Sequence, residues 1–324
     1  MQRILVMRID FLGDMVCTTA LIHSLKTEWP DTEIHVLANK CNADVLSGNP
    51  DITRVHHYIY SKNRYRNPRG GLLSALIDKF NLIISLRRLK FDLMIIPNGG
   101  MNKNSIQFSR WLNIQDKRWH NSETEFDDRN IEHVTHRPIK HEVLAGYDLM
   151  PELCVTSTDD LQLYVYPHPE LKKQWSEKLR NNDKKNVGFF ISNKAYERRW
   201  PWASWYSLAQ SFGSDFNIII FSNPGEKPKQ DALNGITVQC IDTETVPDLI
   251  AAMSQLDVVV SADSAPVHLG SALQIPVVGL FEARPEKYFR WYPVGVHHTL
   301  LYSGKYIDSI SVVDVKEAVY SLIS

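Results

Sequence analysis

The sequence predicts an α/β protein of two domains, each built on a parallel β-sheet that is covered by helices. Short apolar runs alternate with segments of helical periodicity along most of the chain, which is the pattern of consecutive βαβ units. The chain has 324 residues, of which 44% are hydrophobic, and this length corresponds to about two domains of ordinary size. A long polar stretch near the middle divides the strands into two series.

The first half is predicted to contain four strands. Residues 3–9, RILVMRI, form a buried strand, and apolar residues then recur at helical spacing from Leu12 to Leu25. The remaining elements are strands at 33–38, 55–60 and 91–97 and helices at about 71–89 and 139–149. Between the last strand and the last helix, residues 118–138 lose apolar periodicity and are predicted to form a long loop, which is typical of functional or disordered segments.

The second half repeats the alternation after a connecting segment, CVTSTDDLQLYVYPHP, at 154–169. Apolar runs predict strands at 186–192, 217–222, 237–241, 257–261 and 276–281. We therefore expect a first domain at 1–155, a second domain at 156–310 and a terminal helical segment at 311–324. Each domain should have its own sheet.

Charge is concentrated in one region of an otherwise neutral chain. The formal net charge is −1, which gives no indication of nucleic-acid binding. Residues 54–118, however, hold thirteen basic and only three acidic residues. Such a region is either a solvated face or the binding surface of an anionic partner, a phosphorylated ligand or acidic lipid headgroups; we favour the anionic partner.

Cysteine usage and hydropathy predict a cytosolic protein. The four cysteines are scattered and form no CxxC pair, which is typical of a reducing compartment. The sequence shows no signal peptide and no apolar stretch long enough to span a bilayer. Contact with a membrane surface remains compatible with this composition.

Two carboxylates, Asp10 and Asp14, follow the first predicted strand within the stretch MRIDFLGDM. Burying charge at the end of a core strand is costly, so these side chains either cap the next helix or carry out chemistry. A second polar turn, at Asp263 and Ser264, follows the strand at 257–261 and precedes a helix that begins near Pro266. The free N–H groups of a helix N-terminus suit a phosphate, although the two side chains have the alternative role of plain caps.

Three ordered motifs resemble those of glycosyltransferase family 9, the ADP-heptose:lipopolysaccharide heptosyltransferases. They are ILVMRIDFLGDMVCTTALIHSLK at the start, RRWPWASWYSLA at 198–209 and DSAPVHLGSALQIPVVGLF at 263–281. The resemblance implies a GT-B fold, in which two Rossmann-like domains face each other across a cleft. It places the acceptor on the N-terminal domain and the nucleotide-sugar on the C-terminal domain, and it predicts that the 311–324 helix crosses back to the first domain.

The resemblance also implies roles for the acceptor-side residues. Asp14 matches the general base that removes a proton from the acceptor hydroxyl, and Asp10 supports it or contacts the acceptor. Gly13 is expected to let the backbone turn sharply, so that Asp14 points into the cleft. Arg64 and Arg66, from the basic region, are expected to bind the phosphates or acidic sugars of the acceptor.

On the donor side, the resemblance implies a set of residues around the nucleotide diphosphate. Arg198 stands where a phosphate-binding lysine is usual, and Ala265 replaces the usual glycine, which narrows the approach of the backbone to the phosphate. His268 either reaches the ligand or packs, and packing is the default for a lone histidine. The full donor set is Arg198, Arg199, Glu226, Asp263, Ser264, Ala265 and His268.

The predicted activity is inverting transfer of heptose from ADP-heptose to an anionic, lipid-linked inner-core saccharide of the Kdo-lipid A type. No HExxH or clear DxD motif is present, so we expect a metal-independent enzyme without a cofactor, peripheral at the cytoplasmic face of the inner membrane. Alternatives are a family member with another nucleotide-sugar donor and a non-catalytic module that binds a nucleotide-sugar or glycan. An NAD(P)-dependent oxidoreductase fits the paired α/β domains too, but the sequence lacks a G-x-G-x-x-G after any strand.

Overall fold

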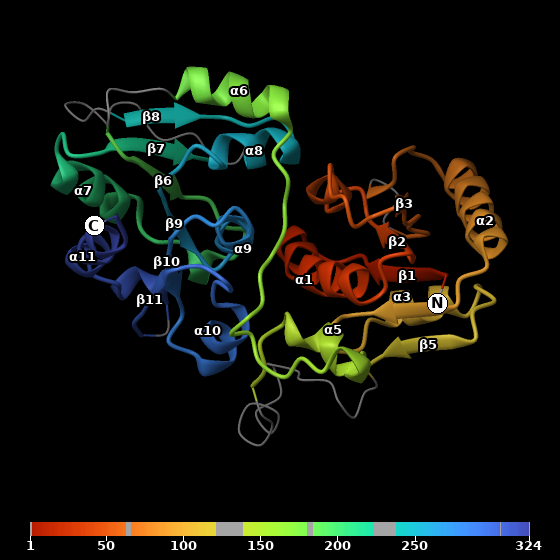
Figure 1. The fold of residues 1–324 in the computed structure, drawn as a ribbon. Coiled ribbons are helices and arrows are strands. Elements are labelled where there is room, and N and C mark those ends of the chain that lie inside the picture. Colours follow the sequence, from red (N-terminus) through yellow and green to blue (C-terminus); the bar gives the residue numbers. More distant parts are fainter. Residues whose placement is uncertain are drawn as a thin grey trace. The chain divides into compact units, whose positions relative to one another are not determined.

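The protein is described by a computed structural model that covers residues 2–62, 66–120, 139–179, 184–222, 238–304 and 306–323 (Figure 1). The chain divides into two compact units, Met1–Val165 and Tyr166–Ser324. The predicted boundary at residue 155 lies inside the first unit. The segment up to Val165 belongs there because Leu163 is buried and the Tyr164 N–H donates to Thr19 Oγ1 at 2.9 Å.

Unit 1 is a five-stranded, fully parallel sheet with the order β3-β2-β1-β4-β5. The strands are β1 (Arg3–Arg8), β2 (Glu33–Ala38), β3 (Arg54–His57), β4 (Leu93–Ile96) and β5 (Asp116–Trp119). The helices are α1 (Leu12–Glu28), α2 (Leu72–Leu89), α3 (Lys103–Ser109) and α5 (Leu144–Asp148), with short 3₁₀ turns at Ala43–Leu46 and Pro151–Leu153. Parallel pairing follows from the helical crossovers between strands.

Strand β1 lies at the centre of this sheet and its two faces carry different partners. Leu5 and Met7 belong to a core cluster that includes Ile83 and Leu86 of α2. Because side chains alternate along a strand, Ile4, Val6 and Arg8 point to the opposite face. Arg8 is thus directed away from the core that α2 covers.

Unit 2 is a six-stranded, fully parallel sheet with the order β11-β10-β9-β6-β7-β8. The strands are β6 (Asn186–Phe190), β7 (Asn217–Phe221), β8 (Val238–Ile241), β9 (Val258–Ala262), β10 (Val277–Phe281) and β11 (His298–Tyr302). The helices are α6 (Pro169–Lys178), α7 (Trp202–Phe212), α8 (Val246–Met253), α9 (Ala265–Ala272), α10 (Pro285–Trp291) and α11 (Val312–Ile323), and 3₁₀ turns lie at Tyr196–Arg198 and Ile307–Ser309.

The terminal helix α11 packs within unit 2, next to α7 (Figure 1). Its buried residues Val315, Ala318 and Val319 join the core cluster formed by β6, β7, β9 and α7. Its apolar face packs on α7 and on strands β9 to β11. The crossing of this helix back to the first domain, which the resemblance implies, stays a prediction.

The predicted strands are present, with ends that differ by a few residues, and the predicted α/β class with two parallel sheets is confirmed. Two edge strands, β5 and β11, were not predicted. Their sequences, DKRW and HTLLY, are partly polar and exposed, so they lack the continuous apolar run of the central strands. The helix expected at 139–149 is shorter and spans Leu144–Asp148.

Candidate active site

Both sheets have a point where the strand order reverses, and one residue predicted from the sequence, Asp10 or Asp263, follows a strand at each point. In unit 1 the reversal lies between β1 and β4, and Asp10 and Asn98 come just after these strands. In unit 2 it lies between β6 and β9, which are followed by Asn193 and Asp263. Ligands of open α/β sheets bind beyond the carboxyl ends of strands at such reversals.

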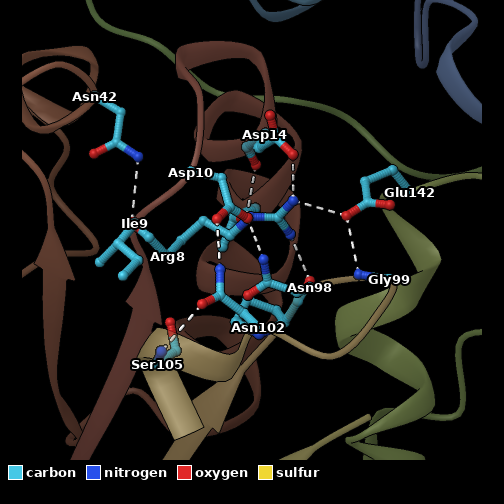
Figure 2. Close-up of polar contacts among 12 residues, drawn as sticks. Arg8, Ile9, Asp10, Asp14, Asn42, Asn98, Gly99, Asn102, Ser105 and Glu142 are labelled. Carbon is cyan, nitrogen blue, oxygen red and sulfur yellow. Dashed lines mark hydrogen bonds and ion pairs between the residues drawn. The ribbon is translucent and has the colours of Figure 1, made fainter. Parts of the chain in front are cut away.

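The centre of the unit 1 site is the guanidinium of Arg8, the last residue of β1, which is 2% exposed. Its Nη2 lies 2.5 Å from Asp14 Oδ1 and 2.7 Å from Glu142 Oε1, and its Nε lies 3.2 Å from Asp10 Oδ2. Nη1 donates to the carbonyl of Pro97 at 2.6 Å. Three carboxylates, two from one short motif and one distant in sequence, therefore share one buried positive charge (Figure 2).

Asparagines after β4 hold the carboxylate of Asp10. Asn98 donates through Nδ2 to Asp10 Oδ2, and Asn102 Nδ2 donates to Asp10 Oδ1 at 2.6 Å. The same Asn102 caps α3, because its Oδ1 accepts from the Ser105 N–H at 3.0 Å. Asp10 is thus tied to a helix N-terminus as well as to Arg8 (Figure 2).

The backbone at the end of β1 is also fixed by asparagines. Asn39 Nδ2 donates to the carbonyls of Ile9 and Asp10, both at 2.7 Å, and Asn42 Nδ2 donates to the carbonyl of Arg8 at 3.2 Å. These carbonyls lie at or just beyond the end of the β1–β2 ladder, where the side-chain amides supply hydrogen-bond donors. The main chain from Arg8 to Asp10 is therefore held in place.

Asp14 lies in the first turn of α1, and its side chain is 16% exposed. The pKa of its carboxyl is raised to about 6, chiefly by removal from water and also by the neighbouring charges of Glu142 and Asp10, with Arg8 opposing the rise. At neutral pH the carboxylate is mostly ionised, yet it is basic enough to accept a proton.

The alternative role of Asp14 as a helix cap is not seen. The N-cap of α1 is Phe11, which has an extended backbone (φ −94°, ψ 172°) and no side-chain cap hydrogen bond. The expectation that Gly13 allows a sharp turn is wrong. Gly13 is the second residue of α1, and it is not among the glycines with positive φ. The extended residue at Phe11 makes the turn, and the helix then presents Asp14 to Arg8.

Of the two arginines predicted to bind the acceptor, Arg66 lies near this site. Its guanidinium carbon is 5.5 Å from the centroid of the Tyr60 ring. The Tyr60 hydroxyl donates to the carbonyl of Ile9 at 2.8 Å, next to Asp10. Arg64 lies outside the described residues.

In unit 2, Arg198 and Asp263 form the core of the predicted donor site. Arg198 Nη1 lies 3.2 Å from Asp263 Oδ2 and 3.3 Å from the Asp263 carbonyl, which also accepts from Asn193 Nδ2 at 3.0 Å. Asp263 is buried, and burial raises the pKa of its carboxyl while Arg198 and Lys287 oppose that rise. Asp263 thus positions Arg198, whose side chain is one-third exposed.

The turn predicted to bind an anion joins β9 to the N-terminus of α9. Ser264 is the N-cap of α9, with an extended backbone and no side-chain cap hydrogen bond. Its Oγ contacts the Ala262 carbonyl at 3.2 Å and Ser261 Oγ at 3.3 Å. Ala265 and Pro266 begin the helix, and both are partly exposed. The first N–H groups of α9 are therefore not capped by Ser264.

The other predicted donor residues have different surroundings. His268 is buried with its ring centroid 5.7 Å from that of Trp291, which favours the packing alternative. Arg199 donates through Nε to the Asn193 carbonyl at 2.5 Å and lines a cavity of about 410 Å³. Aromatic side chains form much of that cavity, among them Tyr196, Trp200, Trp202, Trp205 and Tyr306. Glu226 lies outside the described residues.

Four residues of the unit 1 site were not predicted from the sequence: Arg8, Asn98, Asn102 and Glu142. Arg8 was counted within an apolar run, although a charge at the end of a buried strand requires a partner and could have indicated the cluster. Nothing local marks Glu142, which is 134 positions from Arg8 in sequence. Within the described part of the chain, no group of three or more His, Cys, Asp or Glu side chains is arranged to hold a metal ion.

Comparison with known proteins gives one family. The model of glycosyltransferase family 9 (heptosyltransferase) matches residues 82–316. A lipopolysaccharide heptosyltransferase 3 of Escherichia coli is 24% identical over 298 residues, which cover 86% of this chain and 83% of that protein.

Solved structures share the fold over its whole length. A glycosyl transferase family 9 structure from Veillonella parvula DSM 2008 has a TM-score of 0.80 at 19% identity and covers 99% of this chain and 97% of its own. E. coli heptosyltransferase WaaC with ADP has a TM-score of 0.76 at 15% identity, and the match covers 99% of this chain and 100% of that one. These likenesses confirm the predicted GT-B class.

Proposed function

Because the chain belongs to glycosyltransferase family 9 and is a glycosyltransferase, we propose that it transfers heptose from ADP-heptose to the inner core of lipopolysaccharide. The curated relative is named for heptosyl transfer to lipopolysaccharide, and one solved neighbour holds ADP. The family also removes the oxidoreductase alternative. The alternative of another nucleotide-sugar donor would use the same turn in unit 2. Comparing transfer rates from ADP-heptose and from other nucleotide-sugars tests which donor the protein uses.

Asp14 is proposed as the general base. As the acceptor hydroxyl attacks the anomeric carbon, its proton must leave, and a carboxylate with a pKa of about 6 can receive it at neutral pH. The proton also relieves the crowding of three carboxylates around one guanidinium, so the receiving side chain loses a destabilising charge. Attack from the face opposite the departing diphosphate inverts the anomeric centre.

Arg198 and the first turn of α9 are proposed to hold the diphosphate. The bond from the anomeric carbon to the diphosphate oxygen breaks, and negative charge grows on that oxygen. Arg198 keeps its guanidinium beside the α9 N-terminus through Asp263, and oriented donors at such a position stabilise the developing charge. We propose that these groups suffice without a divalent metal.

The observation that carries this proposal is the raised pKa of Asp14 in a carboxylate cluster at the end of β1. The test incubates the protein with ADP-heptose and a heptose-deficient lipopolysaccharide core, with and without EDTA, and follows product by mass spectrometry. Replacing Asp14→Asn should lower kcat by about 10²–10⁴-fold, the usual contribution of a general base. The matched control is Glu28→Gln, an exposed carboxylate at the end of the same helix.

The outcomes separate the alternatives. Transfer that is unchanged in the Asp14→Asn variant would remove the proposed base, and loss of transfer in EDTA would remove metal independence. Binding of ADP-heptose with no product from the unmodified protein would instead favour the non-catalytic binding module. Faster transfer from another nucleotide-sugar would replace the donor and leave the base intact.

A further inference from the structure

The first half of α2 exposes a group of large apolar side chains, which we call the α2 apolar face: Leu72, Leu73, Leu76, Ile77 and Phe80. Their exposed fractions run from 54% for Leu72 to 76% for Leu73. At 100° per residue these positions fall within about 140° of the helix circumference, so they form one continuous stripe. Soluble proteins rarely leave such a stripe uncovered, and one that persists marks an interaction surface.

Other positions of α2, among them residues of its second half, account for the folding of the helix. Ala75, Ile83 and Leu86 are buried, and Ile83 and Leu86 pack into the core cluster beneath β1 and β4. The helix is therefore anchored without help from its apolar face. In Figure 1, α2 lies at the margin of its unit.

Positive charge lies at one end of the α2 apolar face. Arg87, Arg88 and Lys90 are exposed at the C-terminal end of α2. The one acidic residue of the helix, Asp78, is paired with Arg69 through both carboxylate oxygens. The surface beside the apolar stripe thus carries a positive charge that acidic side chains of α2 do not cancel.

A tryptophan extends the surface beyond the helix. Trp111 is 55% exposed, and the ammonium of Lys79 lies 5.8 Å from the centroid of its ring. Arg110, the preceding residue, is exposed as well. Exposed tryptophan beside basic and aliphatic side chains is the composition of protein surfaces that sit at the lipid–water interface.

We propose that the α2 apolar face and the basic residues around it dock this protein on the surface of an anionic phospholipid bilayer. Leucine, isoleucine and phenylalanine side chains enter the headgroup–acyl boundary, while Arg87, Arg88 and the Lys79–Trp111 pair contact phosphates. No helix in the described ranges is long and apolar enough to cross a bilayer, and docking needs none. As a route to a lipid-linked acceptor, the inference rests on the proposed function.

Vesicle co-sedimentation without any donor or acceptor tests the docking itself. The full chain should bind vesicles with 30 mol% phosphatidylglycerol, an experimental choice of about a third anionic lipid, far better than pure phosphatidylcholine vesicles, and salt should weaken the binding. The double variant Leu73→Glu/Phe80→Glu should lower the partition coefficient at least tenfold. Arg87→Gln should lower it about fivefold, the effect of one basic residue near an anionic surface.

The control is Val313→Glu, which adds one glutamate at an apolar position of α11 in unit 2 that is 61% exposed, close to the 64% of Phe80. It should bind vesicles like the unmodified protein, and circular dichroism should show all variants folded. Equal binding by the Leu73→Glu/Phe80→Glu variant, or equal binding to neutral and anionic vesicles, would overturn the proposal. A dimer in light scattering that this variant dissociates would assign the face to a second copy of the chain instead.

Activity distinguishes failure of this inference from failure of the proposed function. With an acceptor embedded in anionic vesicles, the Leu73→Glu/Phe80→Glu variant should lose most of its transfer rate. With the deacylated, water-soluble acceptor it should keep the rate of the unmodified protein. A variant equally active on both acceptors would overturn the docking role, whereas no transfer by any form, with vesicle binding intact, would overturn only the proposed function.

Discussion

Replacing Asp14→Asn should stabilise unit 1 at pH 8 while it removes activity. In the folded protein the pKa of Asp14 is raised from 3.8 to about 6. At about 1.4 kcal/mol per pKa unit, the ionised carboxylate costs the folded state up to about 3 kcal/mol. That cost already includes the attraction of Arg8, which still has Asp10 and Glu142 as partners in the variant.

The sign of the pH dependence follows from proton uptake. Between about pH 4 and 6 the folded state holds a proton on Asp14 that the unfolded chain has released, so the free energy of unfolding falls as pH rises through this window. The cost is complete above pH 6 and absent below about pH 4. The variant should therefore exceed the parent by about 1–3 kcal/mol at pH 8 and match it near pH 4.

The assay must report on unit 1 alone, because a chain of two units need not unfold in one step. Native-state hydrogen exchange of the β1 and β4 amides gives the free energy of unfolding of unit 1. The exchange is read by mass spectrometry at pH 8 and pH 5, with a correction for intrinsic exchange rates. Asp31→Asn, at an exposed carboxylate after α1, serves as the control and should change it by less than about 0.5 kcal/mol. A parent more stable than the Asp14→Asn variant at pH 8 would refute the reasoning.

Three further outcomes are expected. The value of kcat/KM should fall about tenfold per pH unit below pH 6 as Asp14 is protonated, and a pH–rate profile measures this. Arg8→Met should lower the free energy of unfolding in urea by about 3–5 kcal/mol, because three carboxylates lose their buried partner; an unchanged midpoint would contradict this. Gly270→Ala should lower the free energy of unfolding of unit 2 by about 1–3 kcal/mol, since the added Cβ would lie 2.8 Å from Val277 Cγ2. Hydrogen exchange of the β9 amides measures this.

The positions of the central strands along the chain could be predicted from the sequence, because buried parallel strands are continuous apolar runs. The runs VGFF in β6 and VVVSA in β9 are buried at every position, and period and length suffice to find them. The edge strand β5, DKRW, has a neighbouring strand on one side only and carries charged residues. Hydropathy therefore cannot distinguish it from a loop.

The sequence predicts only those residues of the candidate site that lie together in one short motif. Asp10 and Asp14 stand within five residues of each other after a strand, and both were found. Arg8 stands inside the apolar run RILVMRI, so hydropathy alone does not distinguish it from the strand around it. Glu142 meets Arg8 only through the fold, and a single sequence carries no local pattern for a contact over 134 positions.

The span of the Arg8 contacts has a consequence for how unit 1 folds. Its guanidinium joins residues 89 and 134 positions away, and closing such long loops costs chain entropy before any contact compensates it. All five strands of the sheet end by Trp119, so a nascent chain can pair them before Glu142 has been synthesised. The third carboxylate therefore arrives last, and catalytic competence should mark completion of folding in this unit rather than formation of its sheet.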